Sequence, residues 1–128
     1  MDESILTSIK KMLGLTEEYD HFDQDIIIYI NSAFMTLKQL NVGPSDGFSI
    51  NDKTAVWRDF ISGGVTTISY DGSSQRAVSL GAIQGYIYTK VKLIFDPPQS
   101  SFAIEALNKI ANEYEWRLNL EFDKEEVE

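Results

Sequence analysis

The sequence predicts an all-α fold, a compact bundle of about four to five helices with a long loop before the fourth helix. Apolar residues recur at spacings of three and four residues in five separate segments. Prolines or glycines follow most of these segments, because proline cannot continue a helix and glycine favours its end. The 128 residues are 43% hydrophobic, which is enough for the core of one domain.

The first helix is expected over residues 3–13, where Ile5 and Ile9 begin an apolar face. Two lysines near its C-terminal end interact favourably with the helix dipole. Asp2 can cap its first turn, and Gly14 is typical of the left-handed residue that ends a helix.

The second helix is expected from Asp23 to residues 41–44, which contain a glycine and a proline. Ile28 and Met35 lie off its main apolar stripe, seven residues apart. A helix with two apolar faces is either central in its own fold or partly exposed for a partner. The main stripe consists of Ile26, Ile27, Ile30, Phe34 and Leu37.

A short third helix is expected after a loop over residues 44–50. Ser49 and Asp52 resemble a capping box at its beginning, and two glycines close it. Trp57, on this helix, is expected in the core rather than at an interface. Residues 65–79 combine strand-like and polar stretches around an Asp-Gly turn, so they predict a surface loop that can hold a small β-hairpin.

The fourth helix is expected over residues 79–95, because two prolines follow it. Tyr86 and Leu93 lie on a second face of this helix. Gly81 and Gly85 each cost about 1 kcal/mol relative to alanine in a helix interior, so they predict the close approach of a neighbouring helix. The core stripe consists of Leu80, Ile83, Ile87, Val91 and Ile94.

The fifth helix is expected to begin at a cap formed by Ser100 or Ser101. Trp116 and Leu120 point away from its main stripe, and both the core and an interface stay open for Trp116. The stripe consists of Ala103, Leu107, Ile110, Tyr114 and Leu118.

The chain is expected to divide into a helical domain over residues 1–120 and an acidic C-terminal tail over residues 121–128. Five of the last eight residues are acidic and one is a lysine. Helical order is therefore expected to fade from Glu121 onward.

The sequence contains no arrangement of residues typical of catalysis, a cofactor or a metal site, so we expect a protein that is not an enzyme. There are no cysteines, and His21 is the only histidine. A zinc site with one histidine and no cysteine is unusual, so a solvated turn is the favoured place for His21. Neighbouring acids such as Glu17 and Glu18 do not face each other as a general acid and base would.

The charge of the chain argues against binding to phosphate or to anionic membranes. The formal net charge is −9, and an acidic surface repels a nucleic-acid backbone and an anionic lipid surface. No apolar run has the length of a membrane span or of a signal peptide. A soluble protein made in a cytoplasm is therefore expected.

The stretch GYIYTKVKLIFDPPQSS at residues 85–101 resembles the signature YIYLKVRLLFDPPTSS of phage head–tail connector (adaptor) proteins of Gram-positive phages and prophages. The resemblance covers nearly the whole chain in order. It departs from the family pattern between residues 61 and 79, where this chain is longer and rich in glycine and serine. The other similar stretches are residues 5–14, 22–27, 43–50 and 115–119.

The resemblance implies a helical structural subunit of the virion neck, assembled in the host cytoplasm. Such a subunit docks beneath the portal protein in a closed ring of about twelve copies and extends the DNA channel toward a stopper or tail-completion protein. DNA passes through this channel without specific binding. The resemblance also implies that the segment after about Leu118 engages the portal and that the loop at residues 65–79 meets the next ring.

A ring subunit needs two different surface patches, one for each neighbour. An alternative hypothesis is a small acidic regulator or inhibitor encoded by a prophage and acting by protein–protein binding. Its acids would cluster on one face, whereas here they occur in several separate segments of the chain. A hydrolase that uses carboxylates or a metal is a third hypothesis, but the sequence offers no paired and buried site for it. The candidate interface residues are Ile28, Met35, Ile68, Tyr70, Tyr86, Leu93, Trp116, Leu120 and Phe122.

Overall fold

The computed structural model describes residues 3–40, 42–44, 46–62 and 80–127, with side chains as far as residue 118. These residues form no strand, and an isolated bridge joins Ser4 to Val56. The predicted all-α fold is confirmed. The predicted β-hairpin at residues 65–79 lies outside the described residues. The helices are α1 (Ile5–Met12), α2 (Asp23–Gln39), α3 (Trp57–Ser62), α4 (Leu80–Phe95) and α5 (Ser101–Val127).

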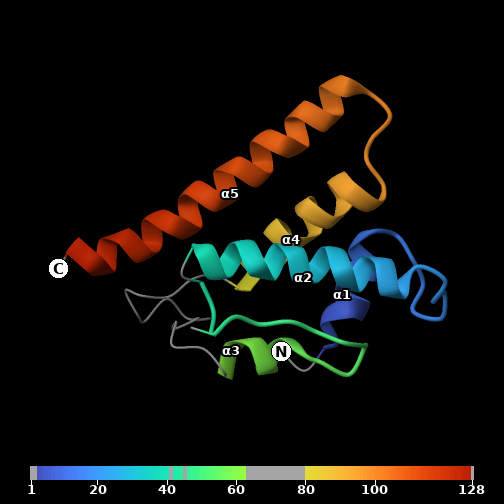
Figure 1. The fold of residues 1–128 in the computed structure, drawn as a ribbon. Helices are drawn as coiled ribbons and strands as arrows, with labels where there is room; N and C mark the ends of the chain where they lie inside the picture. The colour runs from blue at the N-terminus through green and yellow to red at the C-terminus, as the bar shows by residue number, and fades with distance from the viewer. Residues whose placement is uncertain (1–2, 41, 45, 63–79, 128) are drawn as a thin grey trace.

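Two helices, α2 and α4, form the centre of the molecule. They pack against each other, and α1 packs against both of them. The long helix α5 packs chiefly against α4, and in Figure 1 its C-terminal end extends past the other elements. The short helix α3 lies at the opposite side of the view from α5. The body is therefore compact, whereas one long helix projects from it.

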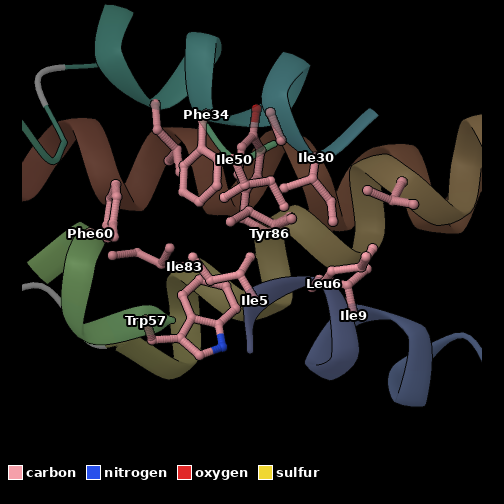
Figure 2. Close-up of a cluster of buried hydrophobic side chains, with 14 of the residues drawn as sticks. Ile5, Leu6, Ile9, Ile30, Phe34, Ile50, Trp57, Phe60, Ile83 and Tyr86 are labelled. Carbon is pink, nitrogen blue, oxygen red and sulfur yellow. The ribbon is translucent and has the colours of Figure 1, made fainter. Parts of the chain in front are cut away.

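The core gathers side chains from all five helices, with Leu118 contributed by α5. Figure 2 shows Ile5, Ile30, Trp57 and Ile83 meeting in one cluster, with Ile50 from the connection between α2 and α3 among them. These residues are almost completely buried. Because each such side chain contributes about 1.5–3 kcal/mol when it leaves water, this cluster is the main stabilising feature of the fold.

Three phenylalanines attach the connection between α2 and α3 to the core. The rings of Phe34 and Phe48 lie 5.0 Å apart, and that of Phe60 lies 5.0 Å from Phe34 and 5.3 Å from Phe48. Gly43 has a φ of +94°, and a Cβ built there would lie 2.6 Å from Cε1 of Phe60. Glycine is therefore needed at this position both for the backbone conformation and for the contact with the ring.

The N-terminal segment is joined to the residues before α3. The amide of Ile5 donates to the carbonyl of Ala55 over 3.0 Å, and the indole Nε1 of Trp57 donates to Oγ of Ser8 over 2.9 Å. The expected core position of Trp57 is confirmed. Ser4 caps α1 by accepting a hydrogen bond from the amide of Thr7. The predicted cap at residue 2 is therefore wrong.

A buried lysine joins α1 to α2. The side chain of Lys10 is 2% exposed, and its Nζ lies 2.9 Å from Oδ1 of Asp23 at the beginning of α2. This contact is an ion pair by its distance, although it is not aligned as a hydrogen bond. The same Nζ donates a hydrogen bond of 3.0 Å to the backbone oxygen of Glu17. One ammonium group therefore connects two helices and the turn between them.

Two predicted helix boundaries are wrong. The capping box at Ser49 does not form, because α3 begins at Trp57. The carboxylate of Asp52 instead accepts a hydrogen bond of 2.8 Å from the amide of Thr54, a local turn that competes with helix formation. At the other end of the chain, α5 continues to Val127, beyond the expected fading at residue 121. That segment contains no glycine or proline and is rich in strong helix formers.

Candidate functional site

The outward face of α2 carries two exposed apolar side chains. Ile28 is 61% exposed and Met35 is 64% exposed, whereas the opposite side of the helix is buried in the core. They are seven positions apart, nearly two helical turns, so they lie on one line along the helix. A hollow of about 340 Å³ opens beside Met35 and is lined also by Lys38 and Phe48.

A side-chain amide determines where this face ends. Nδ2 of Asn31 donates to the carbonyl of Ile50 over 2.9 Å, and the amide of Ile50 donates to Oδ1 of Asn31 over 2.7 Å. These two hydrogen bonds hold the backbone at residue 50 against one side of α2. The connecting segment therefore covers the side of Phe34 and leaves Ile28 and Met35 uncovered.

A second apolar face lies on α5. Phe102 is 82% exposed and Trp116 is 64% exposed. These residues are fourteen positions apart, so they also lie on one line along their helix. Ala111 and Leu118, on the other side of α5, are buried. The sequence did not decide whether Trp116 lies in the core or at an interface. In the structure the side chain of Trp116 lies at the surface.

Close contacts fix the orientation of α5 on α4. A Cβ built on Gly85 would lie 2.5 Å from Oη of Tyr114, so the close approach that this glycine predicts is confirmed. Next to it, Oη of Tyr86 donates a hydrogen bond of 2.8 Å to Oε2 of Glu115. The same oxygen of Glu115 lies 3.8 Å from Nζ of Lys90. Burial and the hydrogen bond to Glu115 raise the pKa of the Tyr86 hydroxyl well above its usual range.

Tyr86 is therefore not a surface residue. Its side chain is fully buried, and its hydroxyl is used by α5 of the same chain. The sequence predicted that a second face of α4 contacts partners, but at Tyr86 this face is covered by α5 of the same chain. Leu93, on the same predicted face, is partly exposed.

Four other candidate interface residues have side chains outside the described part of the chain. Ile68 and Tyr70 lie outside the described residues. Leu120 and Phe122 belong to α5, but their side chains lie beyond the described part. Their part in any interface stays a prediction.

Phe102 and Ile94 differ from expectation. Phe102 was not among the candidate interface residues. It lies in the first turn after a serine cap and beside the stripe that begins at Ala103, and this position could have indicated that its side chain is exposed. Ile94 was expected in the core stripe of α4, and it is half exposed. Phe95, beside it in the last turn of α4, packs against Phe22 with 5.3 Å between ring centroids, so this turn directs Phe95 rather than Ile94 toward the body of the protein.

The ionisable side chains of the described residues form no metal-binding group. No three of their histidine, aspartate or glutamate side chains are arranged to hold a metal ion. His21 is exposed and lies edge-on to Phe22, with 4.7 Å between ring centroids. Glu113 pairs with Arg117 over 2.6 Å and Glu115 with Tyr86, so these neighbouring carboxylates have different partners.

Comparisons with known proteins give one family. No helix among the described residues has both the length and the apolar character needed to cross a membrane. No curated protein and no solved structure matches the chain significantly. A family model described as phage connector protein matches residues 5–125, from the first residue of α1 almost to the end of α5. The match covers nearly all of the chain and agrees with the resemblance found in its sequence motifs, and the chain therefore belongs to the phage connector protein family.

Proposed function

We propose that this chain is a head–tail connector subunit that docks as a ring beneath the portal and extends the DNA channel toward the stopper and tail proteins. The observation that carries the proposal is the family match over residues 5–125, because it includes all five helices rather than one motif. A structural, connector-type role in a phage follows from the family. The portal, the ring and the place in the virion neck are the proposed part.

The exposed apolar side chains support a role in assembly. Apolar side chains as large as Trp116 and Phe102 are frequent anchors of protein–protein contacts, and here they lie in water on a helix that is already packed on its other side. Ile28 and Met35 form a separate apolar face on another helix. A subunit with two different neighbours in a ring needs two such faces.

The net charge of −9 suits a channel through which DNA slides. Lysine and arginine side chains that neutralise phosphates release counterions and hold DNA tightly at low salt. Acidic side chains repel the backbone instead, so DNA moves past them without a specific contact. An excess of acids over bases in the chain therefore favours passage over binding.

The C-terminal part of α5 is the proposed contact with the portal. This helix is 27 residues long, and its end lies beyond the other elements in Figure 1. Leu118 is the last buried residue described on α5, so the residues after it can be removed without opening the described core. The segment at residues 65–79 is the proposed contact with the next ring toward the tail.

Deleting residues 119–128 tests the portal contact. The shortened chain is expected to keep its helical circular dichroism and a cooperative thermal transition, and to lose co-sedimentation with its purified portal protein. Tyr19→Ser is the matched control, because it removes a half-exposed aromatic side chain far along the chain from α5 and is expected to co-sediment normally. Full co-sedimentation of the shortened, folded chain would refute the role given to this segment.

A further inference from the structure

We infer that α5 is a detachable arm, which separates from α4 as one rod while α1–α4 stay folded. The arm turns about the connection at residues 96–100. For its purpose the inference rests on the proposed portal contact, because a freed α5 reaches more positions than one held on α4. The opening itself is a property of the single chain and can be measured without a portal.

The core of the body depends little on α5. Among the described side chains, Leu118 is the only member of the buried core cluster that α5 contributes. Ala111 is the only other buried side chain described on α5, and Tyr114 packs against the cluster while staying partly exposed. Separation of α5 therefore uncovers few of its apolar side chains, whereas global unfolding uncovers the whole cluster.

Polar side chains make the rest of the contact, and water already reaches two of them. Oη of Tyr86 donates a hydrogen bond of 2.8 Å to Oε2 of Glu115, which lies 3.8 Å from Nζ of Lys90. The side chain of Lys90 is 36% exposed and that of Glu115 is 31% exposed. Water can replace these partners as they part, so breaking the contact costs less than breaking a fully buried pair. Tyr86, Lys90 and Glu115 form the latch of the arm.

The helix beneath the arm is anchored to the body without α5. It packs against α2 and α1, and its side chains Ile83, Ile87 and Val91 are buried in the core. At its last turn, Phe95 packs against Phe22 with 5.3 Å between ring centroids. These contacts hold α4 in place up to the residue before the connection, so α5 can leave alone.

The connection between the two helices is suited to act as a hinge. Pro97 and Pro98 have no amide hydrogen, so no helical hydrogen bond continues through them. On one side, the amide of Asp96 donates to the carbonyl of Lys92 over 3.1 Å and completes α4. On the other side, Oγ of Ser100 accepts a hydrogen bond of 3.1 Å from the amide of the third residue of α5 and caps that helix. Each helix is therefore complete without the other.

The arm is long enough to remain a helix when it leaves α4. It has 27 residues and is rich in strong helix formers, whereas isolated helices become marginal below about 12–15 residues. Glu113 and Arg117 form an ion pair of 2.6 Å within the helix and support it locally. Phe102 and Trp116 are exposed already in the closed state, so opening does not change their burial.

The reactivity of single introduced thiols tests the opening, because the natural chain contains no cysteine. Ala111→Cys places a thiol on the packed side of α5, and Ala33→Cys places one in the core on α2. The two alanines are closely matched, since they are 3% and 1% exposed. The folded variants react with an aromatic disulfide reagent at increasing urea concentrations. Ala111→Cys is expected to react about tenfold faster or more, with a weaker dependence on urea, because local opening exposes less surface than global unfolding.

The latch is tested in the Ala111→Cys background. Tyr86→Phe removes the hydrogen bond to Glu115 and is expected to raise the thiol reaction rate about three- to tenfold. Tyr88→Phe is the matched control, because Tyr88 is partly buried on the same helix and no hydrogen bond within the described part of the chain joins its hydroxyl to α5. This control should leave the rate unchanged. Equal rates at the two alanine positions, or an unchanged rate in Tyr86→Phe, would overturn the inference.

Amide hydrogen exchange of the natural chain gives a readout that needs no substitution. A helix in water protects its amides only weakly, so residues 104–118 of α5 are expected to exchange about tenfold faster or more than residues 30–37 of α2. Equal exchange in both segments would refute a separate opening of α5. A ring on the portal together with this equal exchange would disprove the arm and leave the proposed function standing. An opening arm in a chain that leaves the portal bare would do the reverse.

Discussion

Removal of the buried charge of Lys10 is expected to destabilise the fold severely. Lys10→Met keeps an unbranched side chain of similar length, but it leaves the carboxylate of Asp23 without its ion pair and the backbone oxygen of Glu17 without a donor. Loss of one partner of a buried pair costs about 3–5 kcal/mol. The side chain of Asp23 is 22% exposed, and water can solvate it in part, so about 2–4 kcal/mol is expected.

The assay is thermal or urea unfolding followed by circular dichroism. An unfolding entropy of about 2.1 cal/mol/K per residue gives roughly 0.27 kcal/mol/K for the 128 residues, so Tm should fall by roughly 7–15 °C. The neighbouring residue offers a matched control. Lys11 is 60% exposed and pairs with Glu3 over 3.0 Å, so Lys11→Met should change the unfolding free energy little, because water screens such a pair.

A double-mutant cycle isolates the pair itself. Asp23→Asn removes the negative charge, and in that background Lys10→Met should cost clearly less than it does in the natural chain. If Lys10→Met changes the unfolding free energy no more than Lys11→Met does, the importance given to the buried ammonium is wrong.

Three further predictions concern α5 and the tryptophans. Gly85→Ala gains about 1 kcal/mol of helix propensity but forces its Cβ against Tyr114, so it should destabilise the protein by about 1–2 kcal/mol. In a Tyr114→Ala background the same substitution should no longer be destabilising. Chemical unfolding measures both variants, and a stabilised Gly85→Ala single variant would contradict the geometry. The pKa of Tyr86 is raised in the folded state, so this hydroxyl stabilises the fold below its unfolded pKa of about 10 and loses that contribution as the pH rises above it. Urea unfolding should therefore show that Tyr86→Phe is less stable than the natural chain at pH 7 and that its unfolding free energy falls less above pH 10. If the unfolding free energies of the two proteins fall in parallel as the pH rises, this role of Tyr86 is excluded. In a Trp57→Phe variant, fluorescence of Trp116 should be quenched readily by acrylamide in the free chain and poorly after mixing with the portal, and equal quenching would show that the α5 face stays uncovered.

Periodicity along the sequence predicted which residues share a helix face, and it was reliable for α2 and for the centre of α4. It was wrong for Ile110, which was expected in the stripe of α5 and is 43% exposed. The stripe of α2 from Ile26 to Leu37 and the central residues of the α4 stripe, Ile83, Ile87 and Val91, are buried as predicted. Tyr86 was misplaced because α4 is central and is covered on more than one side. The number of covered sides depends on the arrangement of other helices, which periodicity does not contain.

Local signals were less reliable where two of them compete. Ser49 and Asp52 fit a capping box by their spacing, but Asp52 uses its carboxylate on the nearby backbone of Thr54. At the C-terminus, the excess of negative charge led to the prediction that helical order fades from residue 121. The helix propensity of these residues is high, and α5 continues to Val127. Charge patterns alone therefore did not determine where this helix ends.

The candidate surfaces were predictable only in part. Ile28 and Met35 could be found because they depart from a clear stripe, and Phe102 was missed because it adjoins one. The two hydrogen bonds between the side-chain amide of Asn31 and the backbone of Ile50 could not be predicted, since they join residues nineteen positions apart. These hydrogen bonds determine which part of α2 stays uncovered.

The most direct test of the central claim is electron cryo-microscopy of the purified portal protein mixed with an excess of this chain. The account predicts one added ring of helical density beneath the portal, coaxial with its channel, with one long helix of each subunit reaching toward the portal. A portal that stays bare at saturating concentrations of a folded chain would contradict it.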